Sequence, residues 1–199
     1  MTEMTEHTSA PDRTVPVRDR LIECASELFY GEGIRAISAD RIIAAVGTTK
    51  ATFYRHFPTK DDLVLAYLER RADWERIAVT TAAQDDDPRR ALQAVAKLLA
   101  DSSCQPGFRG CPFINAGAEY ADPTHPIRRL VEDQRSWWWT FFRGLATRLG
   151  TPAGKPSYAV ADQMMMLRDG ALVAGYLGDP TRVGDRLTTA FNAIVDAAL

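Results

Sequence analysis

Apolar residues recur at helical spacing along most of the chain, and no stretch shows the strict alternation that predicts a strand. The pattern therefore predicts an all-α protein of about nine helices. The expected helices cover the segments from Ser38 to Gly47 and from Thr48 to Pro58, together with residues 17–30, 59–83, 88–103, 113–121, 124–149, 157–177 and 180–198. Pro and Gly lie between several of these segments, as expected at helix ends.

Two short helices separated by a tight turn are predicted near the N-terminus. Ser38 is a good N-cap for the first helix, and Gly47 stands where a helix ends in a left-handed residue. The second helix begins at a cap supplied by Thr48 or Thr49 and ends before Pro58. This second helix has polar and basic side chains where a core would need apolar ones. That layout is typical of a helix-turn-helix, whose second helix lies in the DNA major groove.

The segment Gly47–Lys60, GTTKATFYRHFPTK, resembles the signature of the TetR family of transcriptional repressors. The resemblance extends from roughly Val17 to Leu68. Thr48 and Ala51 depart from the family pattern, which more often has an aliphatic residue and a glycine there, and neither change threatens the fold. The resemblance implies a three-helix DNA-binding head with a helix-turn-helix, followed by a larger helical domain for ligand binding and dimerisation.

The resemblance also assigns DNA contacts to individual residues. Base-edge contacts are expected from Lys50 and Thr52, with Thr49 and Arg55 beside them. Phosphate contacts are expected from Tyr54, His56 and Lys60, and Ser38 and Arg41 could also reach the backbone. Phosphate contacts fix the register, whereas base contacts carry sequence information. For each arginine, the alternative is a solvated helix face without a DNA contact.

The charge of the whole chain does not indicate nucleic-acid binding, because the net charge of the 199 residues is −2. The local balance is different. Between residues 35 and 60 a single acid, Asp40, accompanies the basic residues Arg35, Arg41, Lys50, Arg55 and Lys60. Acidic residues gather elsewhere, as at 85–87. We therefore expect a basic tip on an acidic body.

We expect a disordered arm over residues 1–16, the DNA-binding domain over 17–63, and the ligand-binding and dimerisation domain over 64–199. The arm lacks the apolar run of a signal peptide, and no segment approaches the roughly 20 apolar residues of a membrane span. With three cysteines and no export signal, the chain is expected in the cytoplasm. No cofactor and no metal site is expected.

Small residues in the last two predicted helices indicate a close helix–helix contact. They are Gly170, Ala171, Ala174, Gly175, Gly178, Ala190, Ala193 and Ala197. By resemblance, these two helices pair with their copies in a homodimer. A dimer would also place two recognition helices in successive major grooves about 34 Å apart, on a palindromic double-stranded operator. Packing of the small residues inside one monomer is the alternative.

Aromatic residues and methionines are frequent in the second domain and indicate a small-molecule pocket. The run Trp137-Trp138-Trp139 cannot face one core, because neighbours on a helix point about 100° apart. Pockets are mostly apolar, with a few polar groups that fix orientation. The candidate ligand residues are Trp74, Phe113, Asn115, Glu119, Trp138, Phe141, Met165, Arg168 and Asp169. Ordinary core packing is the alternative for most of them.

The two cysteines around residues 105–110 suggest an alternative kind of sensing. Cys104 and Cys111 match no common zinc spacing. The segment Gly110–Phe113, GCPF, resembles one found in some TetR-like regulators that sense electrophiles. A helix N-terminus favours the thiolate, and nearby Arg109 would help. Cys111 is therefore a possible redox residue, although a buried and inert thiol is the alternative.

The function expected from these features is that of a ligand-responsive repressor, which binds a palindromic operator as a dimer and is released by a small-molecule inducer. A helical enzyme is the rival of another class. The three histidines are scattered, and no Ser, His and acid set or Gly-rich phosphate loop stands out, so no catalytic residue is expected. A DNA-bound architectural or activating protein is a further rival, which a pocket too small for more than water would favour.

Overall fold

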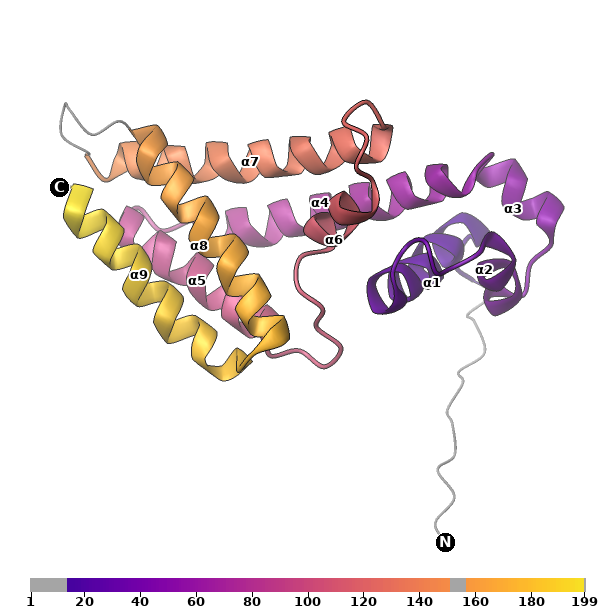
Figure 1. Ribbon diagram of the computed structural model, residues 1–199, viewed down its shortest axis with the longest axis horizontal. Coiled ribbons are helices and arrows are strands. Elements are labelled where there is room, and N and C mark those ends of the chain that lie inside the picture. The colour runs from indigo at the N-terminus through magenta and orange to yellow at the C-terminus, as the bar shows by residue number, and fades with distance from the viewer. Residues whose placement is uncertain (1–13, 151–156, 199) are drawn as a thin grey trace, which may run out of the picture. The chain divides into compact units, whose positions relative to one another are not determined.

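The computed structural model describes residues 14–150 and 157–198 (Figure 1). Helices and no strands are found within these residues, which confirms the all-α prediction. The helices are α1 (Val17–Glu32), α2 (Ala39–Val46), α3 (Lys50–His56), α4 (Lys60–Ala82), α5 (Pro88–Ser103), α6 (Pro112–Glu119), α7 (Pro126–Arg148), α8 (Ser157–Leu177) and α9 (Val183–Ala198), with a 3-10 turn at Pro180–Arg182. None of the described helices is long and apolar enough to cross a membrane.

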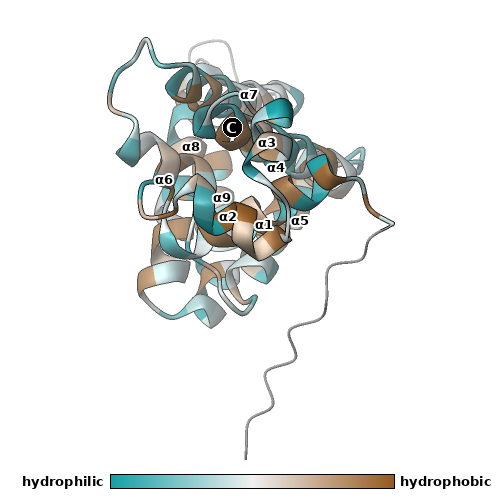
Figure 2. Ribbon diagram, turned by 90° about the vertical axis from the view of Figure 1, so that its right-hand side faces the viewer, coloured by the Kyte–Doolittle hydropathy of each residue, from teal (hydrophilic) through white to brown (hydrophobic). Residues whose placement is uncertain are grey.

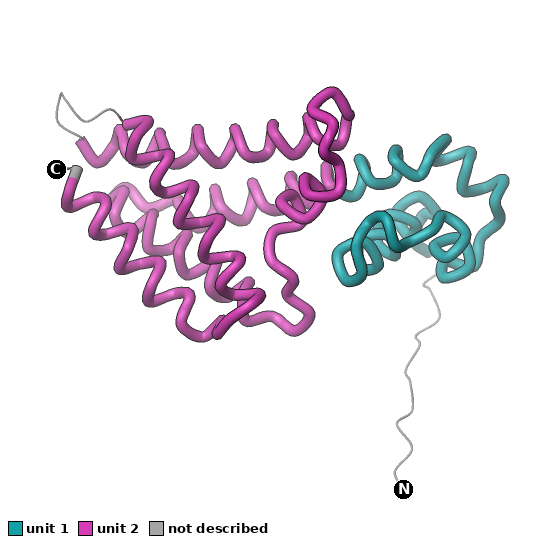
Figure 3. The backbone as a smooth tube through the Cα atoms, viewed as in Figure 1, with its two compact units in different colours: residues 1–67 teal, residues 68–199 magenta. Residues whose placement is uncertain are grey.

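The chain forms two compact units, residues 1–67 and residues 68–199 (Figure 3). The division falls inside α4, which therefore contributes residues to both units. The boundary predicted after residue 63 also lies within α4. Residues 1–13 of the predicted arm lie outside the described residues.

The first unit, called the head below, is a small helical bundle with an apolar core. Figure 2 shows that apolar and polar residues alternate along its helices. Each fully buried large apolar side chain contributes roughly 1.5–3 kcal/mol to stability. The buried residues of the head are Leu21, Ile22, Ala25, Phe29, Ile34, Ile37, Ile42, Ile43, Val46, Phe53, Phe57, Leu63, Val64, Ala66 and Tyr67.

The start of α4 closes the head with a capping box. The carboxylate of Asp62 accepts hydrogen bonds from the backbone nitrogen and the hydroxyl of Thr59, both at 2.8 Å. In return, the Thr59 hydroxyl accepts the Asp62 backbone N–H at 3.1 Å. The reciprocal bonds satisfy donors at the helix start that would otherwise lack partners.

The second unit packs α7 against α8, α5 against α9, and α8 against α9. Because these helices contribute their apolar stripes to one core, most large side chains of the unit are buried there. The principal buried residues are Leu92, Val95, Leu99, Phe113, Ile127, Trp138, Phe142, Leu145, Met164, Leu187, Phe191 and Val195.

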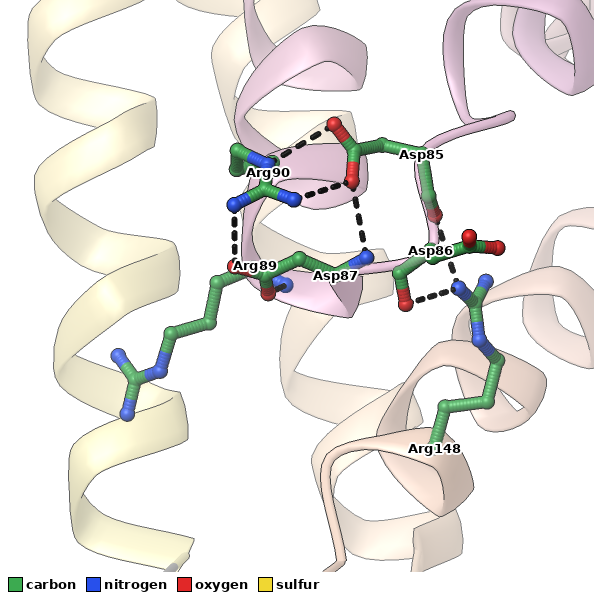
Figure 4. Close-up of polar contacts among 6 residues, drawn as sticks. All are labelled: Asp85, Asp86, Asp87, Arg89, Arg90 and Arg148. Carbon is green, nitrogen blue, oxygen red and sulfur yellow. Dashed lines mark hydrogen bonds and ion pairs between the residues drawn. The ribbon is translucent and has the colours of Figure 1, made fainter.

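Polar contacts hold the connection between α4 and α5 (Figure 4). Asp87 caps α5 by accepting the Arg89 backbone N–H at 2.9 Å, as its position before Pro88 predicts. The Asp85 carboxylate accepts two hydrogen bonds from Arg90, both at 2.9 Å. Arg148 at the end of α7 donates to the backbone carbonyls of Asp85 and Asp86, both at 2.9 Å. The acidic run at 85–87 is thus a structural element of the second unit.

Several predicted helix boundaries need correction. Helix α9 begins at Val183 rather than at 180, because Pro180–Arg182 forms a separate 3-10 turn. Helix α1 continues through Gly31 to Glu32, and only Gly33, with φ of 96°, ends it. Helix α6 covers Pro112–Glu119 rather than 113–121, because Pro112 occupies the favourable first helical position. Helix α7 begins at Pro126 rather than 124, since the His125 side chain accepts the Ile127 backbone N–H at 3.2 Å and caps it.

Beyond Tyr67, the largest apolar residues of α4 face outward. Trp74 and Ile77 are 52% and 69% exposed, whereas Ala72 and Val79 are buried. The smaller apolar residues therefore pack inward. The guanidinium of Arg71 covers the Trp74 ring at 4.5 Å, which gives this exposed aromatic a partner at the surface.

Candidate functional site

The α2–α3 turn has the local geometry of a helix-turn-helix. The Ser38 hydroxyl accepts the Arg41 backbone N–H at 3.2 Å and caps α2. Gly47 ends α2 in the left-handed region, with φ of 68° and ψ of 43°. The Thr49 hydroxyl accepts the Thr52 backbone N–H at 3.1 Å, so Thr49 rather than Thr48 caps α3. Glycine fits this turn because a side chain at positive φ would be strained.

Helix α3 separates its apolar and polar residues onto different faces. Phe53 is fully buried and Phe57 at its end is 2% exposed. Tyr54 is 47% exposed, and Lys50 and Arg55 are also exposed. The aromatic pair anchors the helix in the head, so that the opposite face is available to a partner.

Two of the predicted DNA-binding cations are paired with carboxylates of the head. Arg41 makes a bidentate contact with Glu32, with N–O distances of 2.7 and 2.6 Å. Lys50 pairs with Asp40 at 2.9 Å. The hydrogen bond from Arg41 lowers the pKa of Glu32, and the hydrogen bond to Asp40 raises the pKa of Lys50. Both pairs are exposed, so their partners can exchange.

Lys60, a predicted phosphate ligand, makes contacts inside the head. Its Nζ donates to the Ile34 carbonyl at 2.6 Å and lies 5.7 Å from the centre of the Phe29 ring. The lysine therefore ties the start of α4 to the segment after α1. His56 is half-buried at the end of α3.

A buried arginine is the main polar feature of the second unit. Arg168 of α8 is 1% exposed and donates to Glu75 of α4 at 3.0 Å and to Asp169 at 2.9 Å. It also donates to the Cys111 sulfur at 3.6 Å, and its guanidinium covers the Trp138 ring at 4.5 Å. We call Arg168, Glu75, Asp169, Cys111 and Trp138 the Arg168 cluster. It joins α4, α7, α8 and the start of α6.

Further polar residues extend the Arg168 cluster to the surface. Gln134 of α7 donates to Glu75 at 2.6 Å and accepts from Arg76 at 2.9 Å. Arg135 pairs with Asp169 at 2.7 Å. The two carboxylates thus each have a second partner, as buried charges require.

The electrostatics of the Arg168 cluster keep its arginine charged. Burial lowers the pKa of Arg168, but Cys111, Glu75 and Asp169 more than offset that effect, so the pKa is raised. Two buried donors of this cluster, Arg168 Nε and Trp138 Nε1, have no hydrogen-bond partner within the described residues. Donors of this kind are free to bind an acceptor from a ligand or water.

A small cavity of about 40 Å³ adjoins the Arg168 cluster. Its lining includes Trp74 and Glu75 of α4, Phe108, Cys111, and Trp138 of α7. A volume of this size holds water and no more, whereas a ligand pocket usually measures about 300–1,000 Å³. The larger hollows of the second unit, of about 700 and 410 Å³, are open grooves at the surface.

The structure brings together only part of the predicted ligand set. Trp74 and Trp138 line the small cavity, as does the predicted redox residue Cys111. Asp169 binds Arg168, which also donates to Glu75 and Cys111 of the lining. The other five predicted residues lie apart from the cavity. Phe113 is buried in the core, the exposed Asn115 donates to the Arg109 carbonyl at 2.9 Å, Phe141 and Met165 line separate surface grooves, and Glu119 is half-buried at the end of α6.

Comparison with known proteins identifies the family that shares this architecture. The profile described as bacterial regulatory proteins of the tetR family matches residues 21–67. A TetR-family transcriptional regulator from Streptomyces coelicolor with a solved structure is 38% identical and has a TM-score of 0.86, with 92% of this chain and 95% of that chain covered. The chain belongs to the TetR family.

Two further relatives of this TetR-family chain are more distant. The HTH-type transcriptional regulator YjdC of Escherichia coli is 29% identical, over 78% of this chain and 81% of that protein. A transcriptional regulator of Saccharomonospora viridis, solved in complex with choline, is 21% identical, with a TM-score of 0.73 over 90% of this chain and 95% of that chain. The chain is accordingly a DNA-binding transcription regulator. Its family and fold are those of regulators rather than enzymes.

The outer surface of α8 and α9 in this TetR-family chain combines small and exposed apolar residues. Met166 and Leu177 are 66% and 74% exposed, and a groove of about 390 Å³ runs over both helices. Gly175, in contrast, faces inward, because an added Cβ would lie 2.8 Å from Ser103. Gly175 therefore packs inside the monomer, whereas Gly170, Ala171, Ala174, Gly178 and Ala190 line the outer groove.

Sequence reasoning missed Glu75 and Gln134. Both are polar residues in helices whose neighbours are charged, so nothing in the pattern marks them as internal. A signal was present at Arg168, since an arginine directly after the apolar run Met164–Leu167 needs a partner if it is buried.

Proposed function

We propose that the chain is a repressor that binds a palindromic operator as a homodimer through α3. The observation that carries this proposal is the exposed polar face of α3, anchored by buried Phe53 and presented after the left-handed Gly47. In this geometry Lys50, Thr52 and Arg55 reach base edges, whereas Tyr54 and Arg41 meet phosphates. Ser38 and Thr49 contribute to DNA binding mainly by capping α2 and α3, and His56, at the end of α3, meets the phosphate backbone of the DNA.

The proposed dimer interface is the outer surface of α8 and α9. Exposed apolar side chains and a groove of about 390 Å³ support this choice, because an apolar surface of this kind favours burial against another subunit. A two-fold interface uses the same surface on both subunits. It would place two copies of α3 on one side of the DNA, at half-sites about 34 Å apart.

The proposed signal is a small molecule that enters beside the Arg168 cluster. Helix α4 contributes residues to both units, and Glu75 of α4 is bound to Arg168 of α8 at 3.0 Å. A ligand that separates these two side chains would shift α4 and thereby the head. Only differential affinity moves such an equilibrium, so the ligand must bind the DNA-free state more tightly. The regulator from Saccharomonospora viridis shows that this fold can hold a small molecule such as choline.

The size of the cavity favours a rival in which no ligand is bound. A cavity of about 40 Å³ admits water alone, so an inducer requires that surrounding side chains move. Trp74, which lines the cavity and is 52% exposed, is the side chain whose movement would open it to solvent. A DNA-bound regulator without an inducer needs no such movement.

Chemical modification of Cys111 is the second candidate signal. Its sulfur accepts a hydrogen bond from the buried Arg168 and lines the small cavity. An electrophile that alkylates this sulfur would place a new group inside the Arg168 cluster. The same change in α4 would follow without reversible binding. Replacement of Cys111 by serine should abolish any response to electrophiles and leave DNA binding intact.

A gel-shift titration tests the DNA-binding proposal first. The probes are the DNA upstream of this chain's own gene and a duplex selected from random sequences by the protein. We expect a salt-sensitive shift with dimer stoichiometry, and Lys50→Ala should change base preference at the selected site by about 1–3 kcal/mol. Tyr54→Phe should weaken binding evenly across sequences. A monomer-sized shift, or none on either probe, would contradict the proposal.

The same gel-shift titration, repeated with compounds, separates the two candidate signals from the rival without a ligand. The panel contains cationic, anionic and neutral apolar molecules, together with an oxidant and an alkylating electrophile. Reversible release by one class supports the inducer. Release by the electrophile alone, lost in Cys111→Ser, supports the thiol. If nothing releases the DNA, the rival without a ligand is favoured.

A further inference from the structure

Two acidic residues of the head form ion pairs with two of the cations proposed to contact DNA. Glu32, the last residue of α1, holds both outer nitrogens of Arg41, at 2.7 and 2.6 Å. Asp40 in the first turn of α2 holds Lys50, the first residue of α3, at 2.9 Å. The side chains of these pairs are 50% and 47% exposed for Arg41 and Glu32, and 68% and 63% for Lys50 and Asp40. Both pairs are therefore open to solvent, as a contact with DNA requires.

A carboxylate and a phosphate use the same donors of a basic side chain. The planar guanidinium of Arg41 matches either group with two parallel hydrogen bonds, and it cannot make both bidentate contacts at once. The Lys50 ammonium can leave Asp40 for a base edge or a phosphate, but the carboxylate then stays beside the DNA. Each DNA contact is thus an exchange of partners, which gains less than the binding of a free cation.

We propose that Glu32 and Asp40 are built-in competitors of DNA, which lower the affinity and the salt sensitivity of the head for any duplex. The inference rests on the DNA contacts proposed above for α2 and α3. A cation that stays on its carboxylate releases no counterion from DNA, so it adds nothing to the salt dependence of binding. A cation that exchanges leaves a carboxylate that repels the phosphates. The same competition makes release from DNA easier for a weak signal.

Arg55 of α3 provides the internal contrast. It is exposed and forms no ion pair with any described residue. Its contact with DNA requires no exchange, so it retains its full effect on affinity and on the salt slope. The head therefore combines at least one free cation with two that are restrained.

Glu32→Gln in the full-length chain is the decisive variant. It keeps the size of the side chain and removes the charge that holds Arg41. The probes are a mixed-sequence duplex of about 30 base pairs, which spans both half-sites, and the duplex selected by the protein. We expect affinity for both to rise by about 2–5-fold for each head, as the loss of one exposed ion pair per subunit implies. The plot of log affinity against log salt should steepen by up to about 0.9 for each head, and thus by up to about 1.8 for the dimer.

Two controls separate competition from a change in net charge. Glu27→Gln on the exposed face of α1 removes the same charge without freeing Arg41, and its effect should be smaller. In the Arg41→Gln background, Glu32→Gln should have little effect, because the cation that it frees is gone. Asp40→Asn should repeat the gain through Lys50. Circular dichroism of each variant checks that the helices are retained.

Three outcomes decide the proposal. A gain specific to Glu32→Gln that disappears with Arg41→Gln supports the competition. A Glu32→Gln variant that binds like the parent, or gains no more than Glu27→Gln, overturns it while DNA binding by the parent stands. A parent chain without salt-sensitive binding to either duplex overturns both this inference and the DNA-binding function on which it rests.

Discussion

The head and the second unit keep their charged pairs in opposite environments. The side chains of Arg41 and Glu32 in the head are 50% and 47% exposed, whereas those of Arg168 and Glu75 in the second unit are 2% and 16% exposed. The buried polar residues of the described chain, Ser103, Gln134 and Arg168, all belong to the second unit. The head therefore presents charge where DNA can reach it. The second unit holds charge where only a small molecule or an internal rearrangement can.

The difference in burial determines how easily each pair can exchange partners. An exposed ion pair contributes about 0–1 kcal/mol, so Arg41 and Lys50 can pass from a carboxylate to DNA with little loss. A buried pair that loses one partner destabilises the fold by about 3–5 kcal/mol. The buried pairs of the Arg168 cluster are thus costly to separate, whereas the exposed pairs of the head exchange readily.

Of the variants that test this difference between the two units, Arg168→Met should have the largest effect. Methionine fills a similar volume but leaves Glu75 and Asp169 without the guanidinium that lies between them. We expect the free energy of unfolding of the second unit to fall by about 3–5 kcal/mol. Urea denaturation followed by tryptophan fluorescence measures it, because Trp138 contacts Arg168 directly.

Arg143→Met is the matched control on α7. Arg143 is exposed and its guanidinium lies 5.6 Å from the centre of the Trp139 ring, so its loss should change stability by less than about 1 kcal/mol. Adding Glu75→Leu to Arg168→Met should recover part of the loss, since an apolar pair avoids the unpaired charge. Equal stability of Arg168→Met and the parent would show that the buried ion pairs of the Arg168 cluster do not stabilise the second unit.

The sequence predicted the head well because its signals are local. Ser38 and Gly47 define the ends of α2 through their own backbone preferences, and Thr59 with Asp62 forms a capping box over three residues. Phe53 and Phe57 lie in the core as the helical period predicts. The sequence did not predict that Glu32 and Asp40 hold the cations, because ion pairs across two helices leave no local pattern.

The second unit was predicted less completely because its site joins distant helices. The bounds of α5 and α8 were correct, since the apolar period is clear in both. The contact of Glu75 with Arg168 spans 93 residues, and no spacing rule relates two such positions. The exposure of Trp74 and Ile77 also depends on which face of α4 the other helices cover. The helical period correctly indicated that the three tryptophans diverge: Trp138 is buried, whereas Trp139 donates to Asp162 at 2.7 Å near the surface.

Lys60→Met gives a smaller effect and tests whether every cation of the head is exchangeable. Lys60 Nζ donates to the Ile34 carbonyl at 2.6 Å in a partly buried position. A hydrogen bond from a charged donor contributes about 1.5–3 kcal/mol, so the head should lose about that much stability. Amide hydrogen exchange of α1–α3 in the full chain measures it. Lys50→Met, whose side chain is exposed, should change exchange in the same helices by less than about 1 kcal/mol.

The DNA-binding behaviour of Lys60→Met decides between two roles. If Lys60 is chiefly a structural tie, exchange accelerates while the salt slope of DNA binding stays within error of the parent. If Lys60 is chiefly a phosphate ligand, as the family resemblance implies, exchange stays unchanged and the salt slope falls by about 0.9 for each head, or about 1.8 for the dimer. The second result would show that Lys60, like Arg41 and Lys50, can exchange its protein partner for DNA. The contrast with the buried pairs of the Arg168 cluster would then be sharper.

Asp85→Asn should have the smallest effect, and it separates burial from membership of the second unit. Asp85 accepts two hydrogen bonds from Arg90 and one from the Asp87 backbone, all at 2.9 Å, but the pair with Arg90 lies at the surface.

The hydrogen bonds to Asp85, those from Arg90 above all, lower the pKa of its carboxyl group from the ordinary value of 3.8. A carboxyl group whose pKa is lower in the folded state stabilises the fold above its unfolded pKa and loses that effect as the pH falls through the folded pKa. Urea midpoints should therefore be slightly lower for Asp85→Asn than for the parent at neutral pH, and should converge below pH 3.8. A loss as large as that of Arg168→Met would mean that charge pairs of the second unit matter regardless of burial, and the contrast between the units would need another cause.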